Sequence, residues 1–428
     1  MKIVVVGLGY IGLPTALMFS KYGQKVVGVD VNKQVIESLN NGKVHIEEPH
    51  IQETLNEVIE NGNFQAKFEP EEADVFIVSV PTPNLDDLHK SCDLSYVKQA
   101  VSNIIGLLQP GNTVIVESTI PPRTMVDVVK PMIEEADFVV GKDIFLVHCP
   151  ERVLPGKIMH ELIHNNRIIG GVTEQCTEKG AEAYRTFVKG ELIRTNTQNA
   201  EMSKLMENTF RDVNIALANE LVQVSLDLGV DALEVIRMAN KHPRVNLHFP
   251  GPGVGGHCLA VDPYFVIAAN PDKANLIRMA RKINTDMPEY VVYWIDQLME
   301  KIGGKKVTLF GATYKGNTDD MRESPSVEIY EHLQSKNYEV SFYDPYVEDK
   351  ILEKDMVEAV NNADLIVVLT DHDAFKQLPS ETLNYMNQQI IFDTKNIVEK
   401  CGEAQYLNFG NLEREYKNMS IVTAEATC

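Results

Sequence analysis

The chain contains 428 residues, more than a single ordinary core holds, and this length predicts two or three domains. Hydrophobic residues make up 44% and charged residues 24%, the proportions of a soluble globular protein. With 61 Asp and Glu against 40 Lys and Arg, the net charge of −21 argues against a nucleic-acid or anionic-membrane surface, because both need concentrated positive charge.

The N-terminal residues 3–20 are uncharged and resemble a signal peptide or a membrane span. They also contain Gly7, Gly9, Gly12 and Pro14, which fit a nucleotide-binding turn better, so we expect a cytoplasmic protein without a transmembrane segment. The cysteines are scattered without a CxxC pair, which predicts neither a disulfide framework nor a metal cluster. They are Cys92, Cys149, Cys176, Cys258, Cys401 and Cys428.

The first 150 residues alternate apolar runs with polar segments of helix length. Such runs are typical of strands buried on both faces of a parallel sheet, and their alternation predicts βαβ units. The predicted strands are 3–7, 25–30, 74–81, 113–118 and 144–150.

The middle of the chain is predicted to be helical. Residues 202–226 form one long helix with apolar residues three and four apart. A second helix begins with the capping pair Asp231 and Glu234. The Gly- and Pro-rich residues 248–263 form a loop, and helices resume to about residue 300.

The last third returns to buried strands, at 306–311, 338–345, 363–371 and 389–396. Its SFYDP, ADLIVVLTDH and IIFDTKN correspond to VVGVD, ADVFIVSVPTP and TVIVEST of the first part, as in a degenerate repeat. The predicted fold is α/β, with two Rossmann-like parallel-sheet domains joined by a long central helix and a helical middle domain. The expected domains are 1–190, 191–300 and 301–428.

The turn Gly7-x-Gly9-x-x-Gly12 follows a strand and opens a helix. The glycines permit a tight turn, a close approach of the backbone to a pyrophosphate, and close helix–sheet packing. Asp30 ends the next strand, where its carboxylate would accept hydrogen bonds from ribose hydroxyls and repel a 2′-phosphate. NAD is therefore favoured over NADP. Thr82 and Thr119 are expected at the same carboxyl edge of the sheet, with ordinary turn polarity as the alternative.

Two further groups of residues are candidates for the site, and the first, with two cations and an amide, suits an anionic or alkoxide-forming ligand. Lys204, Asn208 and Arg211 share one face of the long helix, with a solvated polar stripe as the alternative. Cys258 lies among glycines, four residues before Asp262, where either a nucleophilic thiol or a small buried side chain is expected. The remaining cations lie in loops: His242, Arg244, Lys315 and Arg322.

Together these motifs resemble the UDP-glucose/GDP-mannose dehydrogenase family over nearly the whole chain. KHPRVN followed by PGPGVGGHCLAVDP is most similar to the branch that acts on UDP-N-acetylmannosamine and supplies surface polysaccharides such as capsule or other cell-envelope polymers. The matching segments are GLGYIGLP, SVPTP, ESTIPP, CPERVLPG, AEMSKLMENTFRDVNIALANE, KHPRVN, PGPGVGGHCLAVDP and FGATYKGNTDDMRESP.

The resemblance implies a four-electron oxidation at C6 of the sugar, in two NAD-dependent hydride transfers, without release of the aldehyde. Cys258 would be the nucleophile, forming a thiohemiacetal and then a thioester. Lys204 and Asn208 would stabilise the oxygen at C6. The other implied roles are Asp262 orienting Lys204 or water, Glu151 as the base in hydrolysis, and Thr119 holding a water near the nicotinamide.

The resemblance also implies the binding residues and a homodimer formed through the central helix. The cofactor would be contacted by Tyr10, Ile11, Asp30, Thr82, Thr119 and Arg322, beside Gly7, Gly9 and Gly12. The UDP-sugar would be contacted by Arg152, Val153, Lys204, Asn208, Arg211, His242, Arg244, Gly255, Tyr314 and Lys315.

Pro155 stands where the UDP-glucose branch has a second carboxylate, so the base role rests on Glu151 alone. Two further differences put glucose in doubt, because Arg152 replaces an aromatic residue and His257 replaces a small one. The same reaction on UDP-N-acetylglucosamine or UDP-glucose stays open, as do a two-electron hydroxyacid dehydrogenase and a non-catalytic NAD-binding protein. A disulfide between Cys92 and Cys258 that blocks the nucleophile is a further hypothesis, with a buried unpaired thiol as its alternative.

Overall fold

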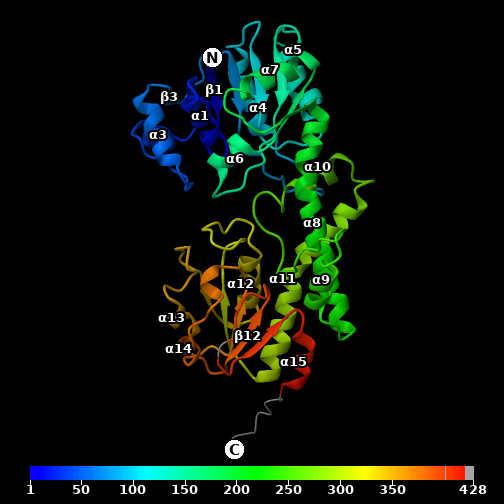
Figure 1. The fold of residues 1–428 in the computed structure, drawn as a ribbon. Helices are drawn as coiled ribbons and strands as arrows, with labels where there is room; N and C mark the ends of the chain where they lie inside the picture. Colours follow the sequence, from blue (N-terminus) through cyan, green and yellow to red (C-terminus); the bar gives the residue numbers. More distant parts are fainter. Residues whose placement is uncertain (401, 420–428) are drawn as a thin grey trace, which may run out of the picture. The chain divides into compact units, whose positions relative to one another are not determined.

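The computed structural model describes residues 1–400 and 402–419, so Cys401 and Cys428 lie outside the described part. These residues form two compact units (Figure 1). The first contains Met1–Glu207 and Tyr264–Pro271, and the second contains Asn208–Pro263 and the described residues from Asp272 onward.

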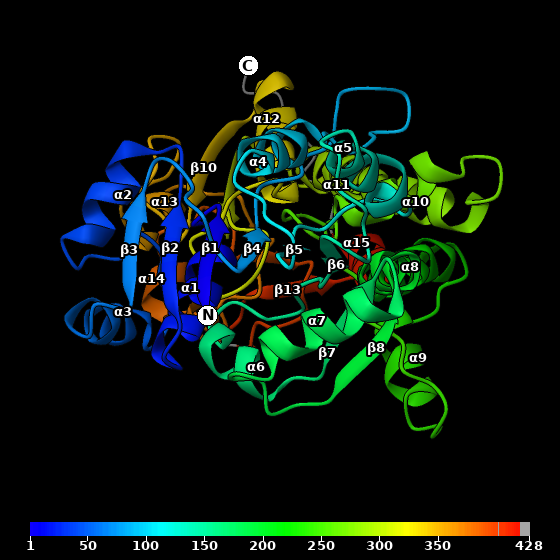
Figure 2. The same cartoon turned by 90° about the horizontal axis from the view of Figure 1, so that it is seen from above.

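The first unit is built on an eight-stranded sheet in the order β3-β2-β1-β4-β5-β6-β7-β8 (Figure 2). Strands β1 to β6 are parallel, and the five strands predicted in the first 150 residues are confirmed as β1, β2, β4, β5 and β6. Strand β7 is antiparallel to β6, so the sheet is mixed at this edge. The strands are β1 (Lys2–Val6), β2 (Lys25–Val29), β3 (Phe64–Lys67), β4 (Val75–Val78), β5 (Thr113–Val116), β6 (Phe145–His148), β7 (Arg167–Gly171) and β8 (Leu192–Asn196).

Helices cover both faces of this sheet. In Figure 2 the sheet is seen with α4 and α5 on one side and α1, α6 and α7 on the other. The bounds are α1 (Gly12–Lys21), α2 (Lys33–Asn40), α3 (Ile51–Glu60), α4 (Ser95–Ile105), the π-helical turn η1 (Met125–Val129), α5 (Lys130–Glu134), α6 (Ile158–His164) and α7 (Glu174–Tyr184).

The predicted long helix is α8 (Thr197–Asp227), with 31 residues. The predicted cap of the next helix, α9 (Ala232–Ala239), is also found, because Asp231 accepts a hydrogen bond from the Glu234 N–H at 2.9 Å. The predicted loop 248–263 ends slightly earlier than expected, since α10 (Asp262–Ala269) begins inside it. Helix α11 (Asn275–Ile302) follows.

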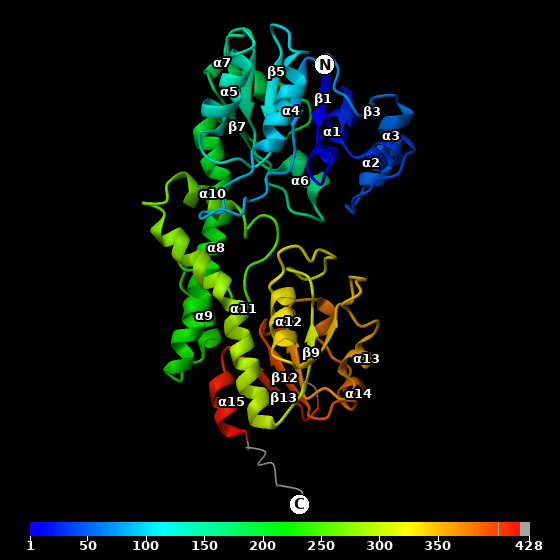
Figure 3. The ribbon, with the colours of Figure 1, turned by 180° about the vertical axis from the view of Figure 1, so that it is seen from behind.

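The second unit contains a five-stranded parallel sheet in the order β10-β9-β11-β12-β13. The four predicted strands of the last third are confirmed. Helix α11 lies beside α12 and α15 (Figure 3), and Lys301 Nζ lies 4.2 Å from the centre of the Tyr416 ring. The remaining elements are β9 (Lys306–Phe310), α12 (Pro325–Ser335), β10 (Glu339–Tyr343), α13 (Met356–Val360), β11 (Leu365–Val368), the 3-10 turn η2 (Asp373–Phe375), α14 (Ser380–Leu383), β12 (Ile390–Asp393), β13 (Gln405–Asn408) and α15 (Leu412–Asn418).

The order β10-β9-β11-β12 repeats the order β2-β1-β4-β5 of the first unit, which supports the predicted repeat. In each copy, an aspartate at the equivalent position accepts hydrogen bonds from the backbone. Asp30 accepts the Leu8 N–H at 2.9 Å and the Asn32 N–H at 2.8 Å. Asp344 accepts the Ala312 N–H at 2.7 Å and the Tyr346 N–H at 2.9 Å.

The copies differ in what else the aspartate contacts. His372 is buried, and its Nε2 lies 2.9 Å from Asp344 Oδ2. Because His372 Nδ1 accepts the Asn317 N–H at 2.9 Å, Nε2 carries the proton and donates it to Asp344. Asp344 is thereby buried and satisfied inside the second unit.

Candidate active site

The glycine turn after β1 has the geometry that a nucleotide requires. Gly7 has φ +94°, and a Cβ on it would lie 2.2 Å from Ser79 O. A Cβ on Gly12 would lie 1.9 Å from Gly7 O, so neither position accepts a side chain. By contrast, a Cβ on Gly9 would meet no described atom within 4 Å, which leaves its backbone open to an approaching ligand.

The groups around this turn fit the pyrophosphate and the adenosine ribose of NAD. No described side chain caps α1 at Ile11. In its first turn the Leu13 N–H donates to Gly9 O at 3.1 Å and Pro14 has no N–H, so the Gly12 N–H is the group of that turn available for a phosphate. Each carboxylate oxygen of Asp30 accepts one backbone N–H and keeps lone pairs for ribose hydroxyls. Tyr10 is exposed beside the turn.

Two more turns at the carboxyl edge carry Thr82 and Thr119, both half-buried. Ser118 ties these turns together, because its Oγ accepts the Val80 N–H at 2.8 Å and donates to Val80 O at 2.7 Å. Sequence reasoning missed this residue, although a serine next to a predicted site threonine is the kind of signal that points to it.

The segment after β6 carries Glu151, Arg152 and Val153, which are all partly exposed, although the side chain of Glu151 itself is only 9% exposed. The Arg152 N–H donates to Glu151 Oε1 at 2.7 Å, and the Arg152 guanidinium pairs with Glu207 of α8 at 2.6 Å. Glu151 Oε2 lies 2.7 Å from Arg167 Nη2. Arg167 belongs to a buried cluster with Glu117, which we did not predict from the sequence. The signal that pointed to it was a glutamate directly after the strand β5.

In the second unit, Cys258 is half-buried in the turn that leads into α10. Its carbonyl oxygen accepts the Val261 N–H at 3.1 Å and the Asp262 N–H at 2.9 Å. Asp262 is buried, and its Oδ2 accepts a hydrogen bond from Asn208 Nδ2 at 2.6 Å. Two predicted site residues that are 54 positions apart are therefore directly bonded.

A polar network supports the start of the cysteine loop. The Gly251 N–H donates to Asn219 Oδ1 at 3.0 Å, and Asn219 Nδ2 donates to Asn284 Oδ1 at 2.9 Å. Asn284 Nδ2 in turn donates to Asp212 Oδ1 at 2.8 Å, which also pairs with Arg281. This network links α8 and α11 to the loop, and because its members are far apart in the chain, sequence reasoning missed it.

Glycines near Cys258 let Tyr314 pack against the backbone. A Cβ on Gly255 would lie 2.2 Å from Glu323 O, and a Cβ on Gly256, which has φ +81°, would lie 2.7 Å from a Tyr314 ring carbon. Burial, followed by the charges of Asp320 and Cys258, raises the pKa of Tyr314. Tyr314 is therefore a neutral hydroxyl beside the thiol loop at neutral pH.

Arg322 lies next to His257, the neighbour of Cys258. Its guanidinium holds Asp320 through two bonds, of 2.9 Å from Nε and 2.7 Å from Nη2, and Nη2 is 3.2 Å from His257 Nδ1. Burial alone raises the pKa of Asp320, but the hydrogen bonds from Arg322 outweigh it, so the pKa is lowered and Asp320 stays ionised.

The remaining predicted residues fall in both units. Lys204 is half-buried on α8 in the first unit. In the second unit Arg211 is exposed, and its charge, after burial, lowers the pKa of His248. His242 Nδ1 accepts the Arg244 N–H at 3.3 Å. Backbone and hydroxyl groups anchor Lys315, whose carbonyl oxygen accepts bonds of 2.9 Å from Thr313 and Thr318.

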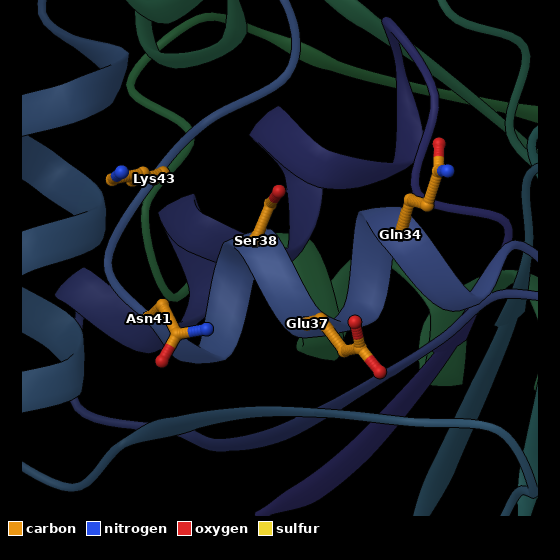
Figure 4. Close-up of a pocket in the computed structure, with 5 residues that line it drawn as sticks. All are labelled: Gln34, Glu37, Ser38, Asn41 and Lys43. Carbon is orange, nitrogen blue, oxygen red and sulfur yellow. The ribbon is translucent and has the colours of Figure 1, made fainter.

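A hollow of about 490 Å³ lies away from all these motifs, beside α2 (Figure 4). Its lining side chains come from the outer part of α2 and the residues after it, with Lys43 as the single cation among them. None of the predicted site residues lines it, so we do not assign it to the active site. The lining residues are Gln34, Glu37, Ser38, Asn41 and Lys43.

Among the described residues, no helix is both long enough and apolar enough to cross a bilayer. The uncharged N-terminal residues that resemble a signal peptide instead form β1 and α1 of the nucleotide turn.

Comparison with known proteins agrees with this geometry. Three domains of the UDP-glucose/GDP-mannose dehydrogenase family match the chain: the NAD binding domain at residues 1–188, the central domain at 198–286 and the UDP binding domain at 308–400. A structure of the UDP-N-acetyl-mannosamine dehydrogenase of Staphylococcus aureus is 55% identical, covers 97% of this chain and 100% of its own, and has a TM-score of 0.91.

Two curated relatives point to related substrates. The UDP-N-acetyl-D-mannosamine dehydrogenase of Methanococcus maripaludis is 46% identical over 93% of both chains. The NDP-N-acetyl-D-galactosaminuronic acid dehydrogenase of Ralstonia nicotianae is 41% identical over 92% of this chain and 96% of its own. The chain thus belongs to the UDP-glucose/GDP-mannose dehydrogenase family and is an NAD-dependent UDP-sugar dehydrogenase.

Proposed function

We propose that the protein oxidises the C6 hydroxyl of UDP-N-acetyl-D-mannosamine to the carboxylate of UDP-N-acetyl-D-mannosaminuronate, for surface polysaccharide synthesis. The observation that carries the proposal is the position of Cys258 in the turn that opens α10, one turn before the bonded pair Asp262–Asn208. Relatives named for this substrate, at 46% and 55% identity, support the choice of sugar.

In the proposed reaction, the glycine turn and Asp30 would hold two NAD molecules in succession, each of which would supply the acceptor for one hydride. Lys204 and Asn208 stabilise the oxygen at C6, Asn208 by an amide N–H while Asp262 fixes its orientation. The Cys258 thiolate adds to the C6 aldehyde, and oxidation of the resulting thiohemiacetal gives a thioester. Glu151 then takes a proton from the water that hydrolyses the thioester.

The binding roles are assigned as the family resemblance implies. We assign the cofactor to Gly7, Gly9, Gly12, Asp30 and the neighbouring Tyr10, Ile11, Thr82 and Thr119, with Arg322 as a further contact. Thr119 would also hold a water near the nicotinamide. The sugar nucleotide is assigned to Arg152, Val153, Arg211, His242, Arg244, Gly255, Tyr314 and Lys315, together with Lys204 and Asn208.

The test is the number of NADH molecules formed per sugar consumed. Two NADH and a uronic acid product from UDP-N-acetylmannosamine support the proposal, and one NADH with a released aldehyde contradicts the cysteine relay. UDP-N-acetylglucosamine and UDP-glucose are run in parallel, and UDP-N-acetylgalactosamine is added because of the Ralstonia relative. Preferred turnover of any of these would overturn the mannosamine assignment.

Substitution of the nucleophile sharpens the test. Cys258→Ala should form at most one NADH per sugar, because the aldehyde then has no thiol with which to form a thiohemiacetal. Cys92→Ser, the matched loss of a half-buried thiol, should still form two under reducing conditions. Two NADH from Cys258→Ala would rule out the relay.

We also propose a cytoplasmic homodimer that pairs through α8. Phe210, Leu217 and Val224 are spaced by seven residues and are all strongly exposed, as in an apolar stripe that packs on a partner helix. Leu217→Glu should produce monomers in size-exclusion chromatography with light scattering. Tyr385→Glu, at an equally exposed position of the same unit, should not.

A further inference from the structure

Arg167 lies between two carboxylates in the interior of the first unit. Its Nη2 is 2.6 Å from Glu117 Oε1 and 2.7 Å from Glu151 Oε2. The side chains are 5%, 0% and 9% exposed in the order Arg167, Glu117, Glu151. Two buried acids therefore share one cation, and ionising both would leave an uncompensated negative charge away from water.

Two further titratable side chains that contact this cluster, Tyr184 and Cys149, are neutral. Tyr184 of α7 donates its hydroxyl to Glu117 Oε1 at 2.6 Å, and its ring lies 4.1 Å from the Arg167 guanidinium. Arg167 Nε is 3.0 Å from the sulfur of Cys149, which follows β6. Burial raises the pKa of Cys149 to about 11 and that of Tyr184 well above its usual value, so neither balances or adds charge at neutral pH.

A proton on Glu117 resolves this imbalance. Glu117 Oε2 and Thr15 Oγ1 of α1 are both buried, and Thr15 is close enough to influence Glu117. Oε2 can donate to the Thr15 hydroxyl when protonated and accept from it when ionised. Burial, with the charge of Glu151, raises the pKa of Glu117 to about 7, although Arg167 and the hydroxyls of Tyr184 and Thr15 oppose the change.

We propose that Glu117 is a positioning residue that carries the proton of this carboxyl pair and, through Arg167, sets the basicity of Glu151. The proposal rests on the proposed function, in which Glu151 is the base. In thioester hydrolysis, the water oxygen bonds to the carbonyl carbon, the carbon–sulfur bond breaks with its electrons going to Cys258, and the proton of water passes to Glu151. While Glu117 is protonated, Arg167 pairs with Glu151 alone and weakens it as a base. Once Glu117 ionises, the two acids share Arg167 and Glu151 becomes the stronger base.

The consequence is a step in the rate of hydrolysis near neutral pH. Glu117→Gln is a permanently neutral copy of protonated Glu117 and keeps an oxygen for Arg167 and Tyr184. Below about pH 6 it should match the unsubstituted enzyme, and above about pH 8 it should be slower by roughly threefold to tenfold. Glu117→Asp keeps the charge and should retain the step. Glu178→Gln, which removes an exposed glutamate paired with Arg194, is the matched control.

The experiment is a single-turnover reaction with acid quench that follows decay of the covalent thioester from about pH 5 to about pH 9. A rate reduced equally at every pH, or a step that persists in Glu117→Gln, overturns the proposal. If the unsubstituted enzyme forms no thioester, the proposed function itself fails, which is a distinguishable result. If Glu117→Gln does not fold, pH-difference infrared spectra of the Glu201→Gln variant decide, because Glu201 is a second carboxyl whose pKa is raised to about 7 and it must be removed first. A carboxylic acid that ionises near pH 7 supports the proposal, and its absence overturns it.

Discussion

Asp262 Oδ2 accepts a hydrogen bond from Asn208 Nδ2 at 2.6 Å, and both side chains are buried. An amide is suited to this position because it can donate to the carboxylate with one hydrogen and keep a second for a ligand oxygen. The bond joins α8 to the first residue of α10. It therefore fixes the amide that we assign to C6 relative to the turn that carries Cys258.

Asn208→Asp should make stability strongly dependent on pH. Two carboxylates at this separation strongly disfavour ionisation of both. At low pH they share a proton, and at higher pH, once that proton is lost, the two negative charges repel each other. Relative to the unsubstituted protein, the free energy of unfolding should fall by about 2 kcal/mol more between pH 5 and pH 8. Denaturant titrations measure it, with Asn214→Asp, half-buried on the same helix, as control. Equal pH dependence in the two variants would show that the carboxylates do not interact.

Asp30→Asn should weaken the preference for NAD over NADP. The substitution keeps an acceptor for the Leu8 N–H but removes the charge that repels a 2′-phosphate. We expect kcat/KM for NAD to fall about tenfold and the activity ratio of NAD to NADP to fall further. Asp74→Asn is the matched control, since Asp74 accepts the Lys2 N–H at the other end of β1. An unchanged ratio in steady-state assays would contradict a ribose contact.

Gly256→Ala should impair binding of the sugar nucleotide more than folding. Both Gly256 and Gly229 have positive φ, of +81° and +66°, so alanine costs about 1 kcal/mol of backbone strain at either. Only at Gly256 would the added Cβ meet a neighbour, 2.7 Å from the Tyr314 ring. The KM for the sugar nucleotide should therefore rise several-fold in Gly256→Ala and stay unchanged in Gly229→Ala. Similar KM values would mean that Tyr314 does not contact the substrate.

Glu201 should make the fold less stable as pH rises. This buried carboxyl accepts the Arg123 and Met125 N–H groups, at 2.7 and 2.8 Å, but burial outweighs these bonds and raises its pKa from 4.5 to about 7. A raised pKa means that the stabilising contribution is complete below pH 4.5 and is lost as the pH passes 7, by roughly 3 kcal/mol.

The measurement is the unfolding free energy of the unsubstituted protein minus that of Glu201→Gln. This difference in unfolding free energy should shrink between pH 5 and pH 8, because only the unsubstituted protein has a carboxyl at position 201 that ionises in this range. The same difference taken with Glu220→Gln, an exposed residue of α8, should be flat. A flat difference for Glu201 as well would show that its carboxyl ionises normally.

Local patterns predicted much of this molecule. The strand before Gly7 and the strand that ends at Asp30 are adjacent in sequence, so apolar runs and glycine spacing suffice to place them. The helix 202–226 was visible from its periodicity. By contrast, β3 was missed because its residues alternate between buried and exposed, and the reversal at β7 because a strand's direction depends on the path of the chain after it.

For the candidate site too, local patterns were predictable from the sequence and contacts between distant residues were not. Asn208, Asp262, Gly255 and Tyr314 were each predicted, since each stands in a distinctive segment. Their pairing was not predicted, because nothing in the sequence says which residues meet across 54 positions. Glu117, which directly follows β5, and Arg167, the first residue of β7, went unnoticed for the same reason, because they are 50 positions apart.

Asp30 and Asp344 occupy equivalent positions in the two repeats, but they differ in the groups that they can still bind. Asp30 still has lone pairs available at the edge of its sheet, whereas the buried imidazole of His372 occupies the corresponding position beside Asp344. The second copy therefore keeps the aspartate of a dinucleotide site, but this aspartate cannot accept hydrogen bonds from a ribose. The second copy, which matches the UDP binding domain of the family, must therefore hold its nucleotide through groups other than this aspartate.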